Sequence, residues 1–191
     1  MKVFLTCVLA LLAMSSTAFA DWVLVKEESA ITFTSTKKEK IVEVHSFMEF
    51  AGQVLQDGRA AVDINLTSAE TNIDIRNDRL DTLLFQVSKF AGAKVKGTVN
   101  IDKVTKLMVG ESFSETIDLS LYLHGINKEV EAKVEVTKLT ADKVKVTSLS
   151  PVIISAGDYG LAEGVEALRK VANLSSINLS VPVNFDLVFE K

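Results

Sequence analysis

Residues 117–136 read IDLSLYLHGINKEVEAKVEV, an alternation of apolar and polar side chains on both sides of a short interruption. Apolar residues occupy every second position from Ile117 to Leu123 and again from Val130 to Val136. A period of two is typical of strands that bury one face and expose the other to water, as in antiparallel sheets. The HGINK segment between the two runs contains Gly and Asn, so we expect a β-hairpin here.

The same alternation recurs along most of the chain outside this hairpin. It is found in residues 31–34, 62–67, 95–102, 143–147 and 181–189, and residues 21–26 and 41–50 are also expected to be strands. The total is eight or nine strands, each with one apolar face. Closing such strands into a barrel removes the exposed edges of the sheet. The sequence therefore predicts an all-β fold, an eight-stranded antiparallel β-barrel.

Two segments depart from the period of two and are expected to be short helices. The first covers residues 76–85 and is expected to begin at a cap near Asn77 or Asp78. The second covers residues 162–173 and is amphipathic. We expect each helix to plug an open end of the barrel. The alternative is that one of them is a mobile lid over a cavity.

The first twenty residues have the pattern of a cleavable signal peptide. Lys2 provides a positive charge, an apolar run follows over residues 3–14, and residues 18–20 (AFA) form a small-x-small cleavage site. The run is shorter than the roughly 20 apolar residues of a membrane-spanning helix. We therefore expect a signal peptide at 1–20, one domain at 21–191, export from the cytoplasm and no membrane span.

The composition excludes several classes of protein. Of 191 residues, 48% are apolar and 24% are charged, as in a folded soluble domain, and the net charge is −4. An acidic chain without a basic block is poorly suited to bind the phosphates of nucleic acid or an anionic lipid surface. We therefore expect no nucleic-acid partner. The sequence leaves the oligomeric state open, and a homodimer is one state that it allows.

Few residues in the chain have the chemistry for catalysis or metal binding. His45 and His124 are the only histidines, both on or near polar positions, and Cys7, the only cysteine, would leave with the signal peptide. A catalytic zinc usually has three protein ligands, and a serine nucleophile needs a base and an orienting acid. Neither pattern is present, so we expect no catalytic residue, no metal ligand and no required cofactor. An alternative hypothesis is a small-substrate isomerase or hydrolase with His45 or His124 as the base.

The side chains on the apolar face of the strands are small. The inward rows at 95–101 and 130–136 are built mainly from Val, Ala and Gly. An eight-stranded barrel either just fills its interior with side chains or leaves room for one ligand. Small inward side chains favour an apolar cavity, while a filled Val-rich core is the alternative. A filled barrel would serve as an envelope protein-interaction module.

Four stretches of the chain form motifs that occur together in a known family. They are FMEFAG at 47–52, the segment 67–90 that begins TSAETN, LYLHGINKEV at 121–130 and IISAGDYG at 153–160. In this order they resemble the YceI-like family of secreted bacterial proteins, over nearly the whole mature chain. The resemblance implies a lipocalin-like barrel with a long apolar tunnel for an isoprenoid chain, such as a quinone tail or a polyprenyl lipid. It also implies a periplasmic location and no catalytic residues.

The chain departs from the family pattern at three places. Residues 76–80 read RNDRL where the family often has R-D-x-H-L, so the family's acid–histidine pair is incomplete here. Ala91 stands where a proline is usual, and the helix expected at 162–173 is longer than in most members. The tunnel that the resemblance implies does not depend on these positions.

The predicted ligand contacts follow from strand parity together with this resemblance. Sixteen side chains are expected to line the tunnel or its mouth: Ile31, Phe33, Phe47, Phe50, Val62, Ile64, Phe85, Phe90, Val99, Leu119, Leu121, Val134, Tyr159, Leu168, Phe185 and Leu187. Phe47 and Phe50 have opposite parity, so both face inward only if a bulge separates them. Arg76 is expected to pair at the surface with one of the aspartates at positions 74, 78 and 81, the alternative being a contact with a ligand head group. The predicted function is that of an exported carrier or reservoir for an isoprenoid lipid.

Overall fold

The structure is a computed structural model that describes residues 22–191. The predicted signal peptide at 1–20 lies outside the described residues. Twelve strand segments make one antiparallel sheet: β1 (Trp22–Leu24), β2 (Ala30–Lys37), β3 (Ile41–Phe47), β4 (Phe50–Val54), β5 (Arg59–Asn65), β6 (Ala69–Glu70), β7 (Gly92–Thr98), β8 (Ser112–Leu123), β9 (Ile126–Lys138), β10 (Lys143–Ser148), β11 (Val152–Ser155) and β12 (Ser180–Glu190).

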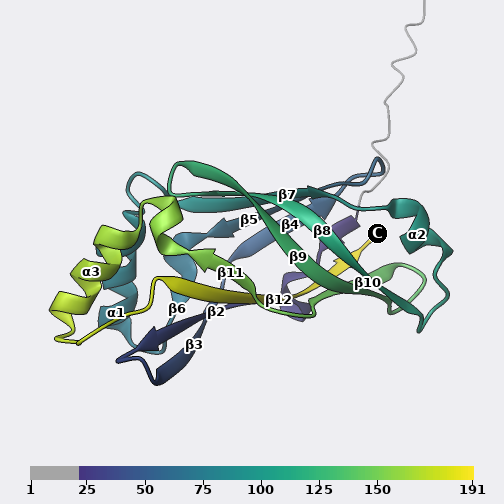
Figure 1. Ribbon diagram of the computed structural model, residues 1–191. Helices are drawn as coiled ribbons and strands as arrows, with labels where there is room; N and C mark the ends of the chain where they lie inside the picture. Colours follow the sequence, from purple (N-terminus) through teal and green to yellow (C-terminus); the bar gives the residue numbers. More distant parts are fainter. Residues whose placement is uncertain (1–21) are drawn as a thin grey trace, which may run out of the picture.

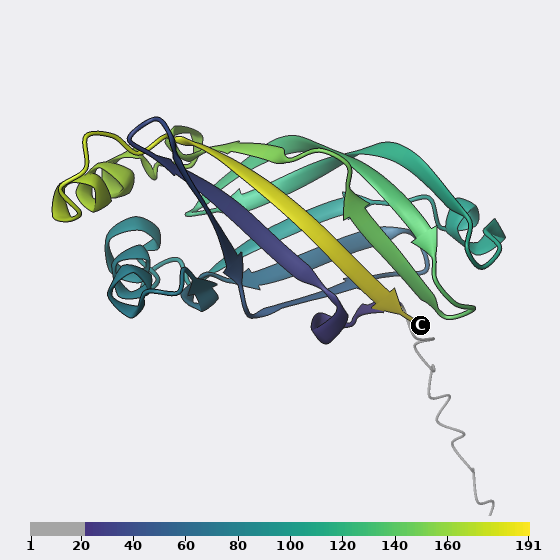
Figure 2. The ribbon, with the colours of Figure 1, turned by 90° about the horizontal axis from the view of Figure 1, so that it is seen from below.

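The twelve segments form eight long strands, as the alternation predicted. β1 and β2, β3 and β4, β5 and β6, and β10 and β11 are each one long strand with a single interruption, while β7, β8, β9 and β12 are continuous. The first long strand pairs with the last, through Val23 opposite Glu190 and Leu24 opposite Phe189. This pairing closes the sheet into an eight-stranded antiparallel barrel (Figure 2).

The hairpin of β8 and β9 is the longest pairing in the barrel. It runs from Ser112 opposite Thr137 to Leu123 opposite Ile126. His124 and Gly125 form its two-residue turn with φ angles of 51° and 81°. Positive φ at both central residues is the geometry of a type I′ turn, whose twist matches that of the strands. The hairpin that the sequence predicts at 117–136 is therefore confirmed and extends beyond it at both ends.

Phe47 and Phe50 both face the core because the strand that carries them is interrupted. β3 ends at Phe47 and β4 begins at Phe50, so two residues lie outside the pairing between them. Phe50 is buried in the core and Phe47 packs against it. The extra residues reverse the parity, as a bulge would.

Within residues 22–191, three α-helices and four short helical segments connect the strands. Their bounds are α1 (Asp74–Arg79), α2 (Ile101–Lys106), α3 (Ala162–Val171), the π-helix η3 (Leu80–Phe85) and the 3₁₀ turns η1 (Lys26–Glu28), η2 (Leu66–Ser68) and η4 (Ala156–Tyr159). The helix expected over 76–85 is α1 continued by η3. The prediction of a cap at Asn77 or Asp78 is wrong, because α1 already begins at Asp74. Asn77 instead accepts hydrogen bonds from the backbone N–H and the hydroxyl of Thr71.

The strand predicted over residues 95–102 ends early. β7 stops at Thr98, and Ile101 begins α2, which the sequence did not predict. The side chain of Asn100 accepts a hydrogen bond from the backbone N–H of Lys103, which is an N-cap. The cap ends the strand although the alternation of side chains continues.

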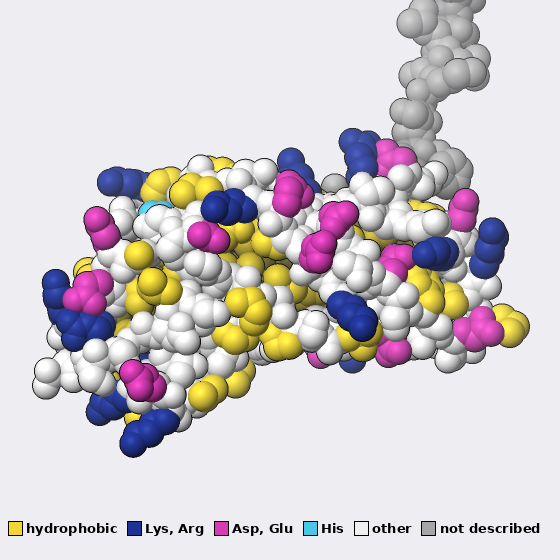
Figure 3. All heavy atoms as spheres, viewed as in Figure 1, with side chains coloured by type: hydrophobic (Ala, Val, Ile, Leu, Met, Phe, Trp, Pro, Cys, Tyr) yellow, Lys and Arg dark blue, Asp and Glu magenta, His cyan; other side chains and the backbone are white. Residues whose placement is uncertain are grey.

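The two predicted helices cover the same end of the barrel rather than one end each. α1 and α3 lie together in Figures 1 and 2, and α2 lies at the opposite end. The strand pairing is sparse below α1 and α3, since β6 meets β3 through only two residue pairs. Hydrophobic side chains gather in the middle of the face shown in Figure 3, where β9, β11 and β12 lie in Figure 1.

Gly164 brings α3 into close contact with η3. A Cβ atom at this position would lie 2.7 Å from the carbonyl oxygen of Leu83 and 2.9 Å from the Cα of Leu84. Both atoms belong to the backbone, which cannot rotate away. The absence of a side chain at Gly164 therefore allows the two helical segments to pack against each other.

We expect Gly164→Ala to destabilise the protein. In an exposed helix this change stabilises by about 1 kcal/mol, whereas overpacking costs about 1–3 kcal/mol. Because of the clash with the backbone, we expect the free energy of unfolding, measured in urea, to fall in Gly164→Ala rather than rise. Gly157→Ala is the matched control, because a Cβ atom at this position would lie 3.8 Å from its nearest neighbour, the Ser155 hydroxyl oxygen. A Gly164→Ala protein as stable as the wild type would contradict the close packing.

Candidate functional site

An apolar cavity of about 620 Å³ runs through the barrel. Its wall includes Trp22, Val54 and Val104 near α2 and Leu168 and Ile177 near the end covered by α1 and α3. The volume lies within the roughly 300–1,000 Å³ of small-molecule sites in proteins. The cavity is therefore large enough for a ligand and extends along the barrel.

Small side chains leave this space open. Val, Ala and Gly residues from β5, β7, β9 and β10 make up much of the wall: Ala60, Ala61, Val62, Ala93, Val95, Gly97, Val130, Ala132, Val134, Val136, Val144 and Val146. Residues of this size do not meet across an eight-stranded barrel, whose width larger side chains would just fill. The size of the inward residues is thus the cause of the cavity.

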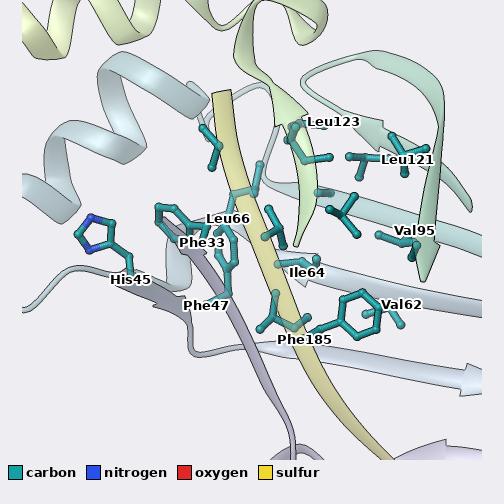
Figure 4. Close-up of a pocket in the computed structure, with 18 of the residues that line it drawn as sticks. Phe33, His45, Phe47, Val62, Ile64, Leu66, Val95, Leu121, Leu123 and Phe185 are labelled. Carbon is teal, nitrogen blue, oxygen red and sulfur yellow. The ribbon is translucent and has the colours of Figure 1, made fainter. Parts of the chain in front are cut away.

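Most of the predicted ligand contacts lie on this wall. The structure places thirteen of the sixteen there: Ile31, Phe33, Phe47, Val62, Ile64, Phe85, Val99, Leu119, Leu121, Val134, Leu168, Phe185 and Leu187. Figure 4 shows several of them converging on one space from different strands. Their position on the wall is a structural result, and their contact with a ligand stays a prediction.

The other three predicted contacts lie away from the cavity wall. Phe50 is buried in the barrel core. The ring of Phe90 packs on the ring of His124, with centroids 4.3 Å apart. Tyr159 is 2% exposed, and its hydroxyl has no hydrogen-bond partner among residues 22–191. Burial raises the pKa of Tyr159, with the nearby carboxylate of Asp158 adding to the effect.

The sequence places His45 on or near a polar position of its strand, and this prediction is wrong, because the side chain is buried on the cavity wall. The side chain is 6% exposed, and its ring lies 5.2 Å from that of Phe33. Figure 4 shows it beside Phe33 at one end of the labelled set. Phe47 has the same parity in β3 and lines the same cavity, so the period of two counted back from Phe47 would have placed His45 inside.

A cluster of charged side chains surrounds His45. Glu43 Oε2 lies 2.6 Å from Arg76 Nη1 and 2.5 Å from Lys37 Nζ. Arg76 also donates from Nη2 to the carbonyl oxygen of Thr71, at 2.5 Å. The expected pairing of Arg76 with an aspartate of its own helix is therefore wrong. No local pattern indicates Glu43 as the partner, because it lies 33 positions from Arg76 in the chain.

The surroundings of His45 disfavour its charged form. Burial lowers the pKa of His45, and the positive charges of Arg76 and Lys37 lower it further, while Glu43 acts in the opposite direction. The pKa of Glu43 is held below its usual value, chiefly by the hydrogen bond from Lys37 and also by Arg76. At neutral pH we therefore expect a neutral imidazole beside an ionised carboxylate.

The two histidines lie in separate places. His45 Nε2 is 2.9 Å from the hydroxyl of Ser35, whereas His124 Nδ1 is 3.2 Å from the carbonyl oxygen of Tyr159. Within residues 22–191, no three His, Cys, Asp or Glu side chains are grouped as metal ligands. In the same part of the chain, no helix is long and apolar enough to cross a membrane.

Comparison with known families gives one match. The model of the YceI-like domain matches residues 22–189. No curated protein matches the chain significantly.

The solved structures that are similar to this chain include the following three. A polyisoprenoid-binding domain from Saccharophagus degradans, implicated in plant cell wall breakdown, is 35% identical, with a TM-score of 0.87 over 89% of this chain and 98% of its own. BcnA from Burkholderia cenocepacia is 15% identical, with a TM-score of 0.67 over 86% of this chain and 98% of its own. The YceI protein of Campylobacter jejuni is 15% identical, with a TM-score of 0.57 over 77% of this chain and 84% of its own. The last two similarities concern the fold alone.

We expect acid to weaken the folded state through His45. Its pKa is lowered in the folded protein, so the unfolded chain takes up a proton at a higher pH. The free energy of unfolding should therefore fall as the pH drops below about 6.5, the ordinary value for histidine. Urea unfolding at pH 7 and pH 5 should show a smaller loss in His45→Gln than in the wild type. His124→Gln is the control, and an equal loss in wild type and His45→Gln would refute the assignment.

Proposed function

This chain belongs to the YceI-like family, and from that premise we propose that it holds an isoprenoid lipid in the barrel cavity. The ligand would be a polyprenyl lipid or a quinone with its tail in the barrel. The protein would act as a carrier or reservoir, without catalysing a reaction. The cavity along the barrel, with an almost wholly apolar wall, is the observation that carries the proposal.

The energetics of such a wall suit a long apolar chain. Each buried CH₂ group contributes about 0.8 kcal/mol, so each five-carbon isoprene unit contributes a few kcal/mol before the cost of ordering the tail. The Saccharophagus degradans relative, described as a polyisoprenoid-binding domain, supports the same ligand class for this chain. Binding along the barrel would be strong, with little selection for the identity of the tail.

The place of action is the periplasm in this proposal. It rests on the sequence of residues 1–20, which has the charge, the apolar run and the small-residue site of a secretory signal. The homodimer that the sequence allows stays a prediction.

The geometry around His45 argues against the enzyme alternative. In a serine–histidine–acid triad the serine and the acid contact different ring nitrogens of the histidine. Here Ser35 lies 2.9 Å and Glu43 lies 3.9 Å from the same atom, Nε2. The arrangement does not orient the ring as a base for Ser35. The open cavity likewise argues against a filled barrel that serves only as an interaction module.

The direct test is chemical analysis of the protein as it comes from cells. We expect the natively purified periplasmic protein, extracted with organic solvent, to yield about one polyprenyl or quinone molecule per chain in mass spectrometry. Well-folded protein from its natural host that yields no isoprenoid would refute the proposal.

A second prediction uses the volume of the cavity. Val134 is 1% exposed and lies on the wall, so Val134→Trp should fill part of the tunnel and abolish ligand binding, at a cost of about 1–3 kcal/mol in stability. Val42→Trp is the matched control, because Val42 is 61% exposed. Bound isoprenoid is measured in both by extraction. A folded Val134→Trp protein that retains its ligand would show that the tail lies elsewhere.

A further inference from the structure

The apolar lining of the cavity continues onto the surface at one end of the barrel. Within residues 22–191, three of the large hydrophobic side chains that are exposed also line the cavity wall: Ile73, Ile75 and Val171. They are 47%, 56% and 49% exposed. Ile73 caps the start of α1, Ile75 belongs to α1, and Val171 ends α3, so all three lie at the end of the barrel that these helices cover (Figure 1). The cavity therefore has an apolar mouth at this end.

A fourth apolar side chain belongs to this mouth. Ile41 begins β3 and is 40% exposed. It has the same parity as His45 and Phe47, which line the cavity, so it faces the same side of the sheet. β3 also contacts α1 directly, through the ion pair of Glu43 with Arg76 at 2.6 Å. We call these four residues the apolar rim: Ile41, Ile73, Ile75 and Val171.

The exposed apolar side chains at the opposite end do not belong to the cavity. Met108 and Val109 lie in the turn after α2 and are 67% and 62% exposed, and neither lines the cavity wall. Among the described residues, the apolar surface and the cavity are thus continuous at the rim and not beside α2.

The charges that flank the rim have both signs. The turn between β2 and β3 carries Lys38, Glu39 and Lys40, while Asp74 begins α1 and Arg79 ends it. Figure 3 shows basic and acidic side chains together at this end of the molecule. Because both signs are present, attraction to an anionic surface contributes little here. The rim offers mainly apolar contact.

The size of the rim favours a membrane over a protein partner. A stable protein–protein interface uses about 20–30 residues on each side, whereas the rim has four. Binding to a bilayer scales with the apolar area that is buried and needs no complementary partner surface. A bilayer is also the medium in which a free isoprenoid tail is dissolved.

We propose that the apolar rim docks on a lipid bilayer, so that an isoprenoid tail passes directly between the bilayer and the cavity. A tail that crossed water on the way would expose all of its apolar surface, which is unfavourable. Contact between the rim and the bilayer removes that step. The inference rests on the proposed function, because the tail has to be the ligand of the barrel.

The test follows the transfer of tritiated geranylgeraniol from loaded protein to phosphatidylcholine vesicles. If the rim docks, transfer occurs during collisions, and its rate constant should rise in proportion to the concentration of vesicles. If the ligand first dissociates into water, dissociation limits the rate constant, which then stays the same at every vesicle concentration. That second result would overturn the docking.

A pair of double variants tests whether the rim is the docking surface. Transfer to cyclodextrin, a soluble acceptor, measures release from the cavity without a membrane. The ratio of the vesicle rate to the cyclodextrin rate should fall about tenfold in Ile73→Ser with Ile75→Ser, because less apolar area enters the bilayer. The fold should survive, since both side chains are about half exposed.

Met108→Ser with Val109→Ser is the matched control, because it removes exposed apolar side chains from the opposite end. Its ratio should equal that of the wild type. A ratio unchanged in the rim variant, or lowered equally in the control, would overturn the assignment. Adding phosphatidylglycerol to the vesicles should leave the ratio nearly unchanged, and a strong dependence on this anionic lipid would show that charge rather than the rim causes docking.

The outcomes separate this inference from the function on which it rests. Geranylgeraniol that binds and then leaves at a rate independent of vesicles would overturn the docking and leave the tunnel intact. Wild-type protein that binds no geranylgeraniol would overturn both. Sedimentation of the wild type and the rim variant distinguishes another occupant: if the variant alone loses a dimer, the rim is an interface between copies of this chain, and the inference fails.

Discussion

The number of strands fixes the width of a β-barrel, and the inward side chains must fill that width or leave it hollow. This chain builds the wall largely from Val, Ala and Gly, so about 620 Å³ is left unfilled. Apolar space of this kind lacks the dispersion contacts of a packed core, and an occupant restores them. An occupant that binds only the folded state also stabilises it by mass action. The stability of the barrel and the binding of an apolar occupant would therefore be coupled.

The two ends of the barrel differ in the side chains and helices that close them. Near α2 the cavity wall includes Trp22, whose ring lies 4.7 Å from the ammonium group of Lys138. At the other end, sparse strand pairing leaves the closure to α1, η3 and α3, and the close contact at Gly164 holds them together. The ion pair between Glu43 of β3 and Arg76 of α1 lies at this same end. The polar side chains of the cavity wall are thus concentrated at the end covered by the helices, while the rest of the wall is mostly apolar.

The alternation of apolar and polar residues predicted the strands well, because a period of two depends only on residues that are neighbours in the sequence. It predicted a hairpin with its turn within residues 124–128, and it required a bulge between Phe47 and Phe50 for both to face inward. The period of two failed to predict the structure where an N-cap starts a helix or where a side chain pairs with a residue far away in the sequence. Asn100 caps α2, so residues 101–102 are helical although the alternation predicts a strand there. Arg76 pairs with Glu43, 33 positions away, rather than with a nearby aspartate. The cavity wall was largely predictable, whereas the polar end depends on contacts that only the tertiary structure creates.

The closing of the barrel has a consequence for the order in which the molecule can form. Leu24 pairs with Phe189, so the first strand cannot pair with its second neighbour, β12, until Ser180–Glu190 has been synthesised, although it can already pair with β3 and β4. The β8–β9 hairpin, in contrast, needs only residues that are close in sequence. Non-local pairings such as that of β1 with β12 form later than local ones. Until the last strand arrives, the inward face is an open apolar sheet. A ribosome that stopped before Ser180 would release a chain with most of its strands and no interior to hold a ligand.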